Sequence, residues 1–186
     1  MGSQVIEAIV CSSRDALLDA LQKGGNANDT EYGLSALILA CTQDREDLVR
    51  DLLRHGADAN ATEQDGSTPI FIAAGLGSES VSQALLDAGA NANALNDIGQ
   101  SPLMVAAKSG SRALVSLLLQ AHADARARDK RGLNAMHWCA TGGDFDQIVS
   151  LLMAAGTDPK DRTVDGKSVL EYAIALNRRA IAAVLA

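Results

Sequence analysis

Histidine and cysteine are the side chains of this 186-residue sequence best suited to metal binding or nucleophilic chemistry. The histidines stand at positions 55, 122 and 137, and the cysteines stand at 11, 41 and 139. Their spacing fits no CxxC or paired metal-ligand pattern, and no Walker A loop, nucleophile elbow, HExxH or EF-hand motif occurs. The sequence therefore predicts no catalytic residue, no metal and no cofactor, and it predicts three buried, reduced thiols.

His137 and Cys139 are the closest pair that a cysteine-dependent mechanism would need. Residues two positions apart on a helix point in different directions, so this pair cannot work together if both lie on one helix. We predict instead that His137 caps a helix or bridges two loops through hydrogen bonds.

Composition and charge narrow the classes of protein to which this chain can belong. The net charge is −7, which disfavours a nucleic-acid binder, because such proteins neutralise phosphates with Lys and Arg. No apolar run is long enough for a transmembrane helix, and no secretory signal is present, so a cytoplasmic protein is expected. Hydrophobic residues make up 47% but aromatic residues only 3%, which favours closely packed helices built from Ala and Leu.

A motif recurs along the chain with a period of 33 or 34 residues. Each copy begins at a glycine and continues into a short segment such as GSTPIFIAA or GQSPLMVAA, and an apolar stretch such as LVSLLLQA follows. The sequences GADAN, GANAN and HADAR close the first three copies. Such self-similarity predicts stacked structural repeats. The anchor glycines are Gly33, Gly66, Gly99, Gly132 and Gly166.

The copies resemble the ankyrin repeat over nearly the whole chain. Residues 68–70 (T-P-I) and 101–103 (S-P-L) stand at the family's T-P-L position, and His137 stands where the family has its histidine. The resemblance implies an all-α solenoid of about six helix-turn-helix units, with short β-hairpin-like loops and a concave groove.

Local signals predict where the helices begin and end. Glycines 77, 110 and 143 are expected to end first helices in left-handed conformations, with Asp44 as the substitute in the first copy. His122 replaces a helix-ending glycine, and an extra residue in TGGDFDQ should lengthen the turn near Asp144 and Phe145. The expected capping residues are Ser35, Thr68, Ser101, Asn134 and Ser168.

We predict a single domain, residues 1–186, because the copies leave no linker between them. Residues 1–28 are expected to form an N-terminal capping half-repeat, and residues 162–186 a C-terminal capping repeat. The internal repeats are predicted at 29–61, 62–94, 95–127 and 128–161, and the protein is expected to be monomeric.

The family resemblance implies that a partner protein binds at the loop tips and at exposed positions of the first helices. The apolar residues at these positions form either a contiguous stripe or scattered surface hydrophobes. Trp138 is assigned either to this surface or to the core, with core packing slightly favoured. The predicted binding residues are Tyr32, Leu34, Asp65, Leu76, Ile98, Lys108, Lys130, Arg131, Leu133 and Trp138.

Charge is distributed unevenly along the chain. Residues 1–99 carry 15 acidic and 5 basic residues, a net of −10, whereas residues 100–186 carry 8 and 11, a net of +3. One loop holds Arg126, Arg128, Lys130 and Arg131. This loop is interpreted either as an ordinary solvated loop or as a basic end that faces an acidic partner.

The sequence thus predicts a non-enzymatic protein–protein interaction module that acts as an adaptor, scaffold or stoichiometric inhibitor, without nucleic-acid or membrane partners. Two alternatives are weighed against it. One is an enzyme or a small-molecule or metal-binding protein, which would need convergent polar groups in a pocket. The other is an artificial binder from a repeat library, which the uneven copies disfavour.

Overall fold

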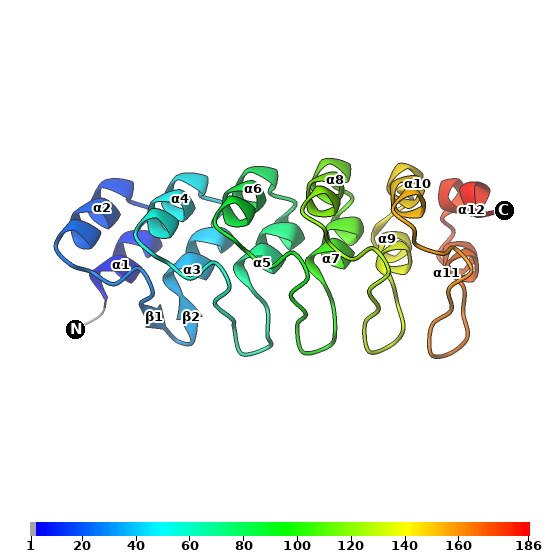
Figure 1. Ribbon diagram of the computed structural model, residues 1–186, viewed down its shortest axis with the longest axis horizontal. Helices are drawn as coiled ribbons and strands as arrows, with labels where there is room; N and C mark the ends of the chain where they lie inside the picture. The colour runs from blue at the N-terminus through cyan, green and yellow to red at the C-terminus, as the bar shows by residue number, and fades with distance from the viewer. Residues whose placement is uncertain (1–2) are drawn as a thin grey trace. The chain divides into compact units, whose positions relative to one another are not determined.

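The computed structural model describes residues 3–186, and within this range the chain forms twelve helices and one two-stranded hairpin (Figure 1). None of these helices is long and apolar enough to cross a membrane. The first six helices are α1 Gln4–Val10, α2 Arg14–Gln22, α3 Ala36–Thr42, α4 Glu46–Arg54, α5 Pro69–Leu76 and α6 Glu79–Asp87. The other six are α7 Pro102–Ser109, α8 Arg112–Gln120, α9 Ala135–Gly142, α10 Asp146–Ala154, α11 Val169–Ala175 and α12 Arg179–Leu185.

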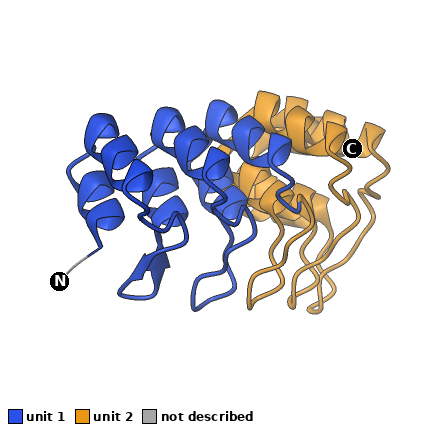
Figure 2. Ribbon diagram, turned by 60° about the vertical axis from the view of Figure 1, so that its left-hand side comes forward, with its two compact units in different colours: residues 1–91 blue, residues 92–186 orange. Residues whose placement is uncertain are grey.

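The helices are arranged as antiparallel pairs in two compact units, residues 1–91 (unit 1) and 92–186 (unit 2) (Figure 2). Within each unit, the first helices of the pairs pack against one another in one layer, and the second helices form another (Figure 1). In unit 1 these layers are α1, α3, α5 and α2, α4, α6. In unit 2 they are α7, α9, α11 and α8, α10, α12. The all-α architecture of about six helix pairs agrees with the prediction.

Alanine and leucine build the core of each unit, as the composition predicts. Ala73 in α5 and Ala107 in α7 are fully buried, and their small side chains allow the first helices to approach closely. The second helices α4, α6, α8 and α10 each carry two adjacent leucines, of which one is fully buried and the other is half-buried. The buried members are Leu52, Leu85, Leu118 and Leu152.

Two of the three thiols are buried, as predicted. Burial raises the pKa of both Cys41 and Cys139 to about 12, so they remain protonated and inert at neutral pH. The prediction for Cys11 is wrong, because its side chain is exposed. Cys11 is the first residue after α1, where the chain turns towards α2 and offers no interior for the side chain.

Side-chain caps begin most first helices where the sequence places them. Ser35 Oγ accepts a hydrogen bond from the Ile38 amide at 3.2 Å, and Ser101 Oγ accepts one from the Met104 amide at 3.4 Å. The prediction for Thr68 is wrong: it precedes α5, but its buried hydroxyl makes no capping bond. Proline begins both α5 and α7, where its missing N–H costs nothing.

Left-handed residues end most helices as predicted. Gly77 and Gly110 have φ of 73° and 84°, and Asp44 adopts φ of 53° in the glycine's place. His122 also turns left-handed, with φ of 61°, so the fold continues without a glycine there.

The extra residue of the fourth copy changes one helix end. It lengthens the α9–α10 turn to residues 143–145, compared with residues 110–111 between α7 and α8. The prediction that Gly143 is left-handed is wrong, because its φ is −175° and the chain leaves α9 in an extended conformation. The ring of Phe145 packs against Gly110 and Gly143, where a Cβ atom would overlap it.

A ladder of asparagine side chains joins successive pairs at the loops after the second helices. In unit 1, Asn28 donates to the Gly56 carbonyl at 2.9 Å and accepts from the Asp58 amide at 2.7 Å. In unit 2, Asn93 makes the equivalent bonds to the His122 carbonyl and the Asp124 amide. One amide side chain thus satisfies a donor and an acceptor of the next copy, which fixes the stacking distance.

Gly142→Ala is expected to destabilise unit 2 by about 2–3 kcal/mol, because a Cβ on Gly142 would overlap the Lys108 carbonyl oxygen of α7. Gly166→Ala is the control: its Cβ would meet open space, so only the left-handed penalty of about 1 kcal/mol applies. Urea unfolding followed by Trp138 fluorescence reports on unit 2. Equal losses for the two variants would contradict this account of α7–α9 packing.

Candidate protein-binding surfaces

The hairpin tips of unit 2 are tied together by backbone hydrogen bonds. The Lys130 amide donates to the Ile98 carbonyl at 3.1 Å, and the Val164 amide donates to the Arg131 carbonyl at 2.9 Å. We call the row formed by Ile98, Lys130, Arg131 and Val164 the tip ribbon. Three hairpins that are far apart in sequence therefore present one ordered surface.

Glycines allow the tips to lie this close. Gly99 and Gly132 have φ of 80° and 76°, and a Cβ on either would lie 3.1 Å from the amide nitrogen of the next tip. A side chain at these positions would strain the backbone and push the tips apart. The regular spacing of the anchor glycines thus has a steric cause in unit 2.

The first hairpin of unit 1 is a regular β-hairpin. Strands β1 Thr30–Glu31 and β2 Leu34–Ser35 pair antiparallel, with Thr30 opposite Ser35 and Glu31 opposite Leu34. The two residues between the strands, Tyr32 and Gly33, have φ of 52° and 82°, which is the geometry of a type I′ turn. Tyr32 is 93% exposed, although bulky residues rarely adopt a left-handed conformation.

Most of the predicted binding residues lie at the surface. Leu34 and Trp138 are half-buried. The exposed members are Tyr32, Asp65 and Leu76 in unit 1, and Ile98, Lys108, Lys130 and Arg131 in unit 2.

The prediction that Leu133 is exposed is wrong, because its side chain is only 1% exposed. The residue after the anchor glycine is buried in three of the five copies, half-buried at Leu34 and exposed at Lys167. Ser67 and Gln100, which occupy the same position in other copies, are also buried. The aligned positions hold Leu, Ser, Gln, Leu and Lys, so the sequence offered no consistent signal that Leu133 is buried.

Val164 was missing from the predicted binding set, although it stands at a hairpin tip. It is 79% exposed, more than Ile98 at 54%. Its position one repeat period after Arg131 was the signal that could have placed it in the set.

Trp138 links the surfaces of α7 and α9 in unit 2. Its indole Nε1–H donates to Asp129 Oδ2 at 3.1 Å, and the Lys108 ammonium lies 5.3 Å from the ring centroid. The second contact is a cation–π interaction at a partly exposed site. The half-buried ring is therefore held in one orientation between the core and the surface.

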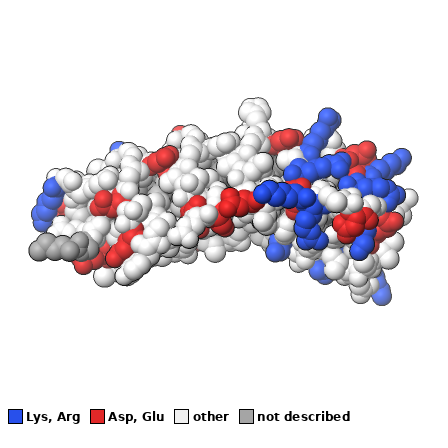
Figure 3. All heavy atoms as spheres, turned by 90° about the horizontal axis from the view of Figure 1, so that it is seen from below, with Lys and Arg blue, Asp and Glu red and all other residues white. Residues whose placement is uncertain are grey.

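One acidic residue of the basic loop is buried, so its carboxylate does not face solvent beside the loop's Lys and Arg side chains. Asp129 is buried and accepts bonds from the Arg131 and Leu133 amides as well as from Trp138. Arg128 pairs with Asp161, and Arg126 Nε donates to the Gly156 carbonyl at 3.0 Å. Figure 3 shows Lys and Arg side chains gathered on the face of unit 2 that carries the hairpins.

His137 performs the structural role that the sequence predicts. It is fully buried, its Nδ1 lies 3.4 Å from the Asn134 amide, and its Nε2 lies 3.4 Å from the Lys167 carbonyl oxygen. Nδ1 also lies 2.8 Å from Asn134 Oδ1, so the ring contacts both the backbone and the side chain of the capping residue. His137 thus caps α9 and bridges to the next hairpin, and burial lowers its pKa.

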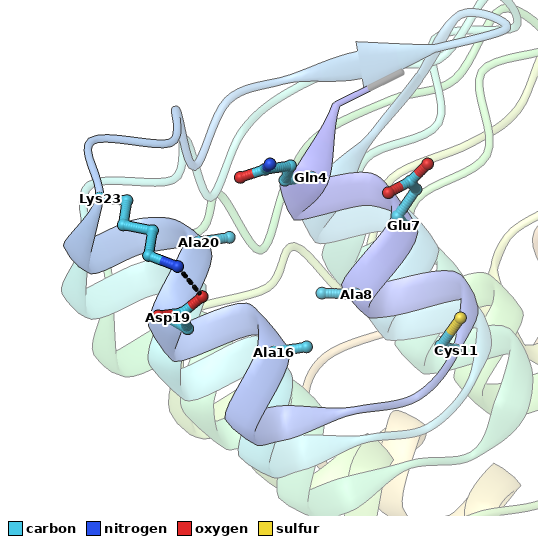
Figure 4. A pocket seen from close by; sticks show the side chains of 8 residues that line it. All are labelled: Gln4, Glu7, Ala8, Cys11, Ala16, Asp19, Ala20 and Lys23. Atoms are coloured by element: carbon cyan, nitrogen blue, oxygen red, sulfur yellow. Dashed lines mark hydrogen bonds and ion pairs between the residues drawn. The ribbon is translucent and has the colours of Figure 1, made fainter. Parts of the chain in front are cut away.

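A pocket of about 350 Å³ lies between α1 and α2 (Figure 4). Ala8, Ala16 and Ala20 point into it, and the Lys23 amine pairs with the Asp19 carboxylate at 2.6 Å on its rim. Glu7 is the remaining charged residue of the lining, beside Gln4 and Cys11. Among residues 3–186, no group of three or more metal-ligating side chains was found.

Tyr32→Asn is expected to stabilise unit 1 by about 1 kcal/mol, because asparagine tolerates the left-handed conformation and tyrosine does not. Tyr32→Phe, which keeps the strain and the ring, is the matched control and should leave stability unchanged. Thermal unfolding followed by circular dichroism measures both. No gain for Tyr32→Asn would show that the turn holds tyrosine without strain.

Stability is expected to fall as the pH decreases from 7 to 5. The pKa of His137 is lowered in the fold, so the unfolded chain binds the proton more readily and gains population as the pH passes below about 6.5. His137→Gln should remove this dependence while keeping the cap, because glutamine also serves at this position of a capping box. Urea midpoints across this range, compared for the two proteins, test the assignment, and identical slopes would refute it.

Comparisons with known proteins agree with the fold. Residues 37–129 and 103–186 match the family described as ankyrin repeats (3 copies). The human 2-5A-dependent ribonuclease is 38% identical over 76 residues, which is 40% of this chain and 10% of that protein. The chain therefore spans only a small part of that relative. The family match covers well over half of the chain, and its extent confirms the resemblance: the chain belongs to the ankyrin-repeat family.

Proposed function

We propose that the chain is a non-catalytic protein-binding module that acts as an adaptor, scaffold or stoichiometric inhibitor. Its family consists of repeats that generally bind proteins, which supports the general class. The short match to the ribonuclease contributes only a related stretch of sequence, so none of that enzyme's activity is carried over.

One observation carries the proposal: ordered hairpin tips hold large apolar side chains in solvent. Tyr32 is 93% exposed, Ile98 54% and Val164 79%. Isolated exposed hydrophobes are common, but these three stand on a paired hairpin or on hydrogen-bonded tips, where their positions are fixed. An ordered backbone loses little conformational entropy on binding, so burial of the apolar side chains that it carries contributes efficiently to affinity.

The first helices add a second contact region in unit 2. Trp138, held by Asp129 and covered by Lys108, is a rigid aromatic side chain of the type enriched at binding hot spots. A partner that displaces Lys108 from the ring would gain access to the indole face.

We also propose that the module is monomeric and works in the cytoplasm. The free, buried thiols of Cys41 and Cys139 support a reducing compartment, because they serve here as small core side chains rather than as halves of disulfides.

Affinity capture from the native source tests the proposed function. Wild type should retain a protein at near-stoichiometric ratio, and the double variant Tyr32→Ser/Ile98→Ser should retain at least about tenfold less, since two exposed apolar anchors are lost.

Met153→Ser is the matched control for the capture experiment. Met153 is 37% exposed but lies on α10, one of the second helices, outside the predicted binding positions, so this variant should capture as wild type does. Equal capture by all three proteins would contradict the assignment of the tips. The absence of any specifically retained protein would contradict the proposed function.

A further inference from the structure

The tip ribbon of unit 2 combines rigidity with an ordered sequence of side-chain types. The path runs from Ile98 through Lys130 and Arg131 to Val164, and each step between hairpins is a backbone hydrogen bond. Apolar side chains therefore stand at both ends and two cationic side chains stand at the centre. Neither end can drift from the centre without breaking one of these bonds.

The two central cations are available to a partner. Lys130 and Arg131 are both exposed, and across residues 3–186 neither side chain forms an ion pair. The nearest acidic residue in sequence, Asp129, is turned inward and bonded to two amides and to Trp138. Asp97 and Asp165 stand beside the apolar residues, so the positive charge is confined to the middle of the ribbon.

The distance between the two ends of the tip ribbon sets the separation of the partner side chains that can contact both ends. Ile98 and Val164 occupy equivalent positions two repeats apart, and packed helices lie about 8–10 Å apart, which gives about 16–20 Å between them. An extended chain advances about 3.3 Å per residue. Side chains alternate between the two faces of an extended chain, so two apolar side chains of a partner would need to be about six residues apart to reach both ends.

We propose that the tip ribbon docks an extended protein segment in which Asp or Glu residues lie between two aliphatic or aromatic residues about six positions apart. This inference rests on the proposed function and names the class of partner. The carboxylates pair with Lys130 and Arg131, and the flanking apolar side chains cover Ile98 and Val164. The outer Asp97 and Asp165 disfavour segments with carboxylates at their ends, which sets the register.

Selection from a displayed library of random peptides of about 12 residues, long enough for this spacing, tests the proposal. The immobilised full chain should enrich peptides with a central acidic residue and flanking apolar residues. Binding of an enriched peptide should weaken at least about tenfold in Lys130→Glu/Arg131→Glu, and it should also weaken as salt is raised. Selection on this charge-reversed variant should enrich peptides with basic centres.

The matched control is Arg112→Glu/Arg179→Glu, which changes the net charge of unit 2 by the same amount. Both arginines are exposed first residues of helices, α8 and α12, where an acidic side chain complements the helix N-terminus. This variant should select and bind the same peptides as wild type. Circular dichroism and Trp138 fluorescence establish that each variant keeps the fold.

Three results would overturn the proposal: no enrichment on wild type, enriched peptides without the acidic centre, or equal weakening by the control variant. Each is distinguishable from failure of the proposed function, which depends on capture of a native protein and on apolar variants. If a native protein is captured but the selected peptides lack an acidic centre, the proposed function is supported and the acidic partner class is refuted.

Discussion

A helix pair of this protein cannot bury its apolar face by itself, and the rest of the structure follows from that constraint. Each pair has two short helices whose leucines and alanines need a neighbouring pair to exclude water. The asparagine ladder sets how neighbours meet, since one amide side chain satisfies both a carbonyl and an amide of the next copy. Stability is thus distributed over the interfaces between neighbouring pairs.

The same stacking creates the candidate binding surface of unit 2. Hairpins attached to stacked pairs are brought into register, and glycine at positions 99 and 132 lets their tips approach to hydrogen-bonding distance. Side chains that would be mobile on an isolated loop are therefore held in a fixed order. Trp138 is positioned in the same way, by an aspartate of the preceding hairpin and a lysine of the preceding helix. Rigidity that arises from the fold is available for recognition without further cost in entropy.

Where the prediction from sequence failed, a side chain had two plausible environments and local pattern did not choose between them. Leu133 was expected at the surface because it flanks a loop tip, but it faces the helices. Cys11 was expected in the core, yet it stands just after α1 and is exposed. Gly143 was expected to turn left-handed, whereas the inserted residue and the ring of Phe145 made an extended exit possible. At Gly143 a distant part of the chain also takes part, because the Phe145 ring packs against Gly110 as well.

The sequence by itself determined the repeat period, the all-α class, the helix-ending residues at positions 77, 110 and 122, and the hydrogen-bonding structural role of His137. These follow from local chemistry: glycine and histidine tolerate left-handed backbone, and apolar periodicity specifies which helix faces need cover. Only the tertiary structure decided which tip residues are exposed, which acidic side chains are buried and hydrogen-bonded, and which cationic side chains of the tip ribbon form no ion pair. Those properties depend on neighbours about 30 residues away, whose distance and orientation are set by the packing between repeats.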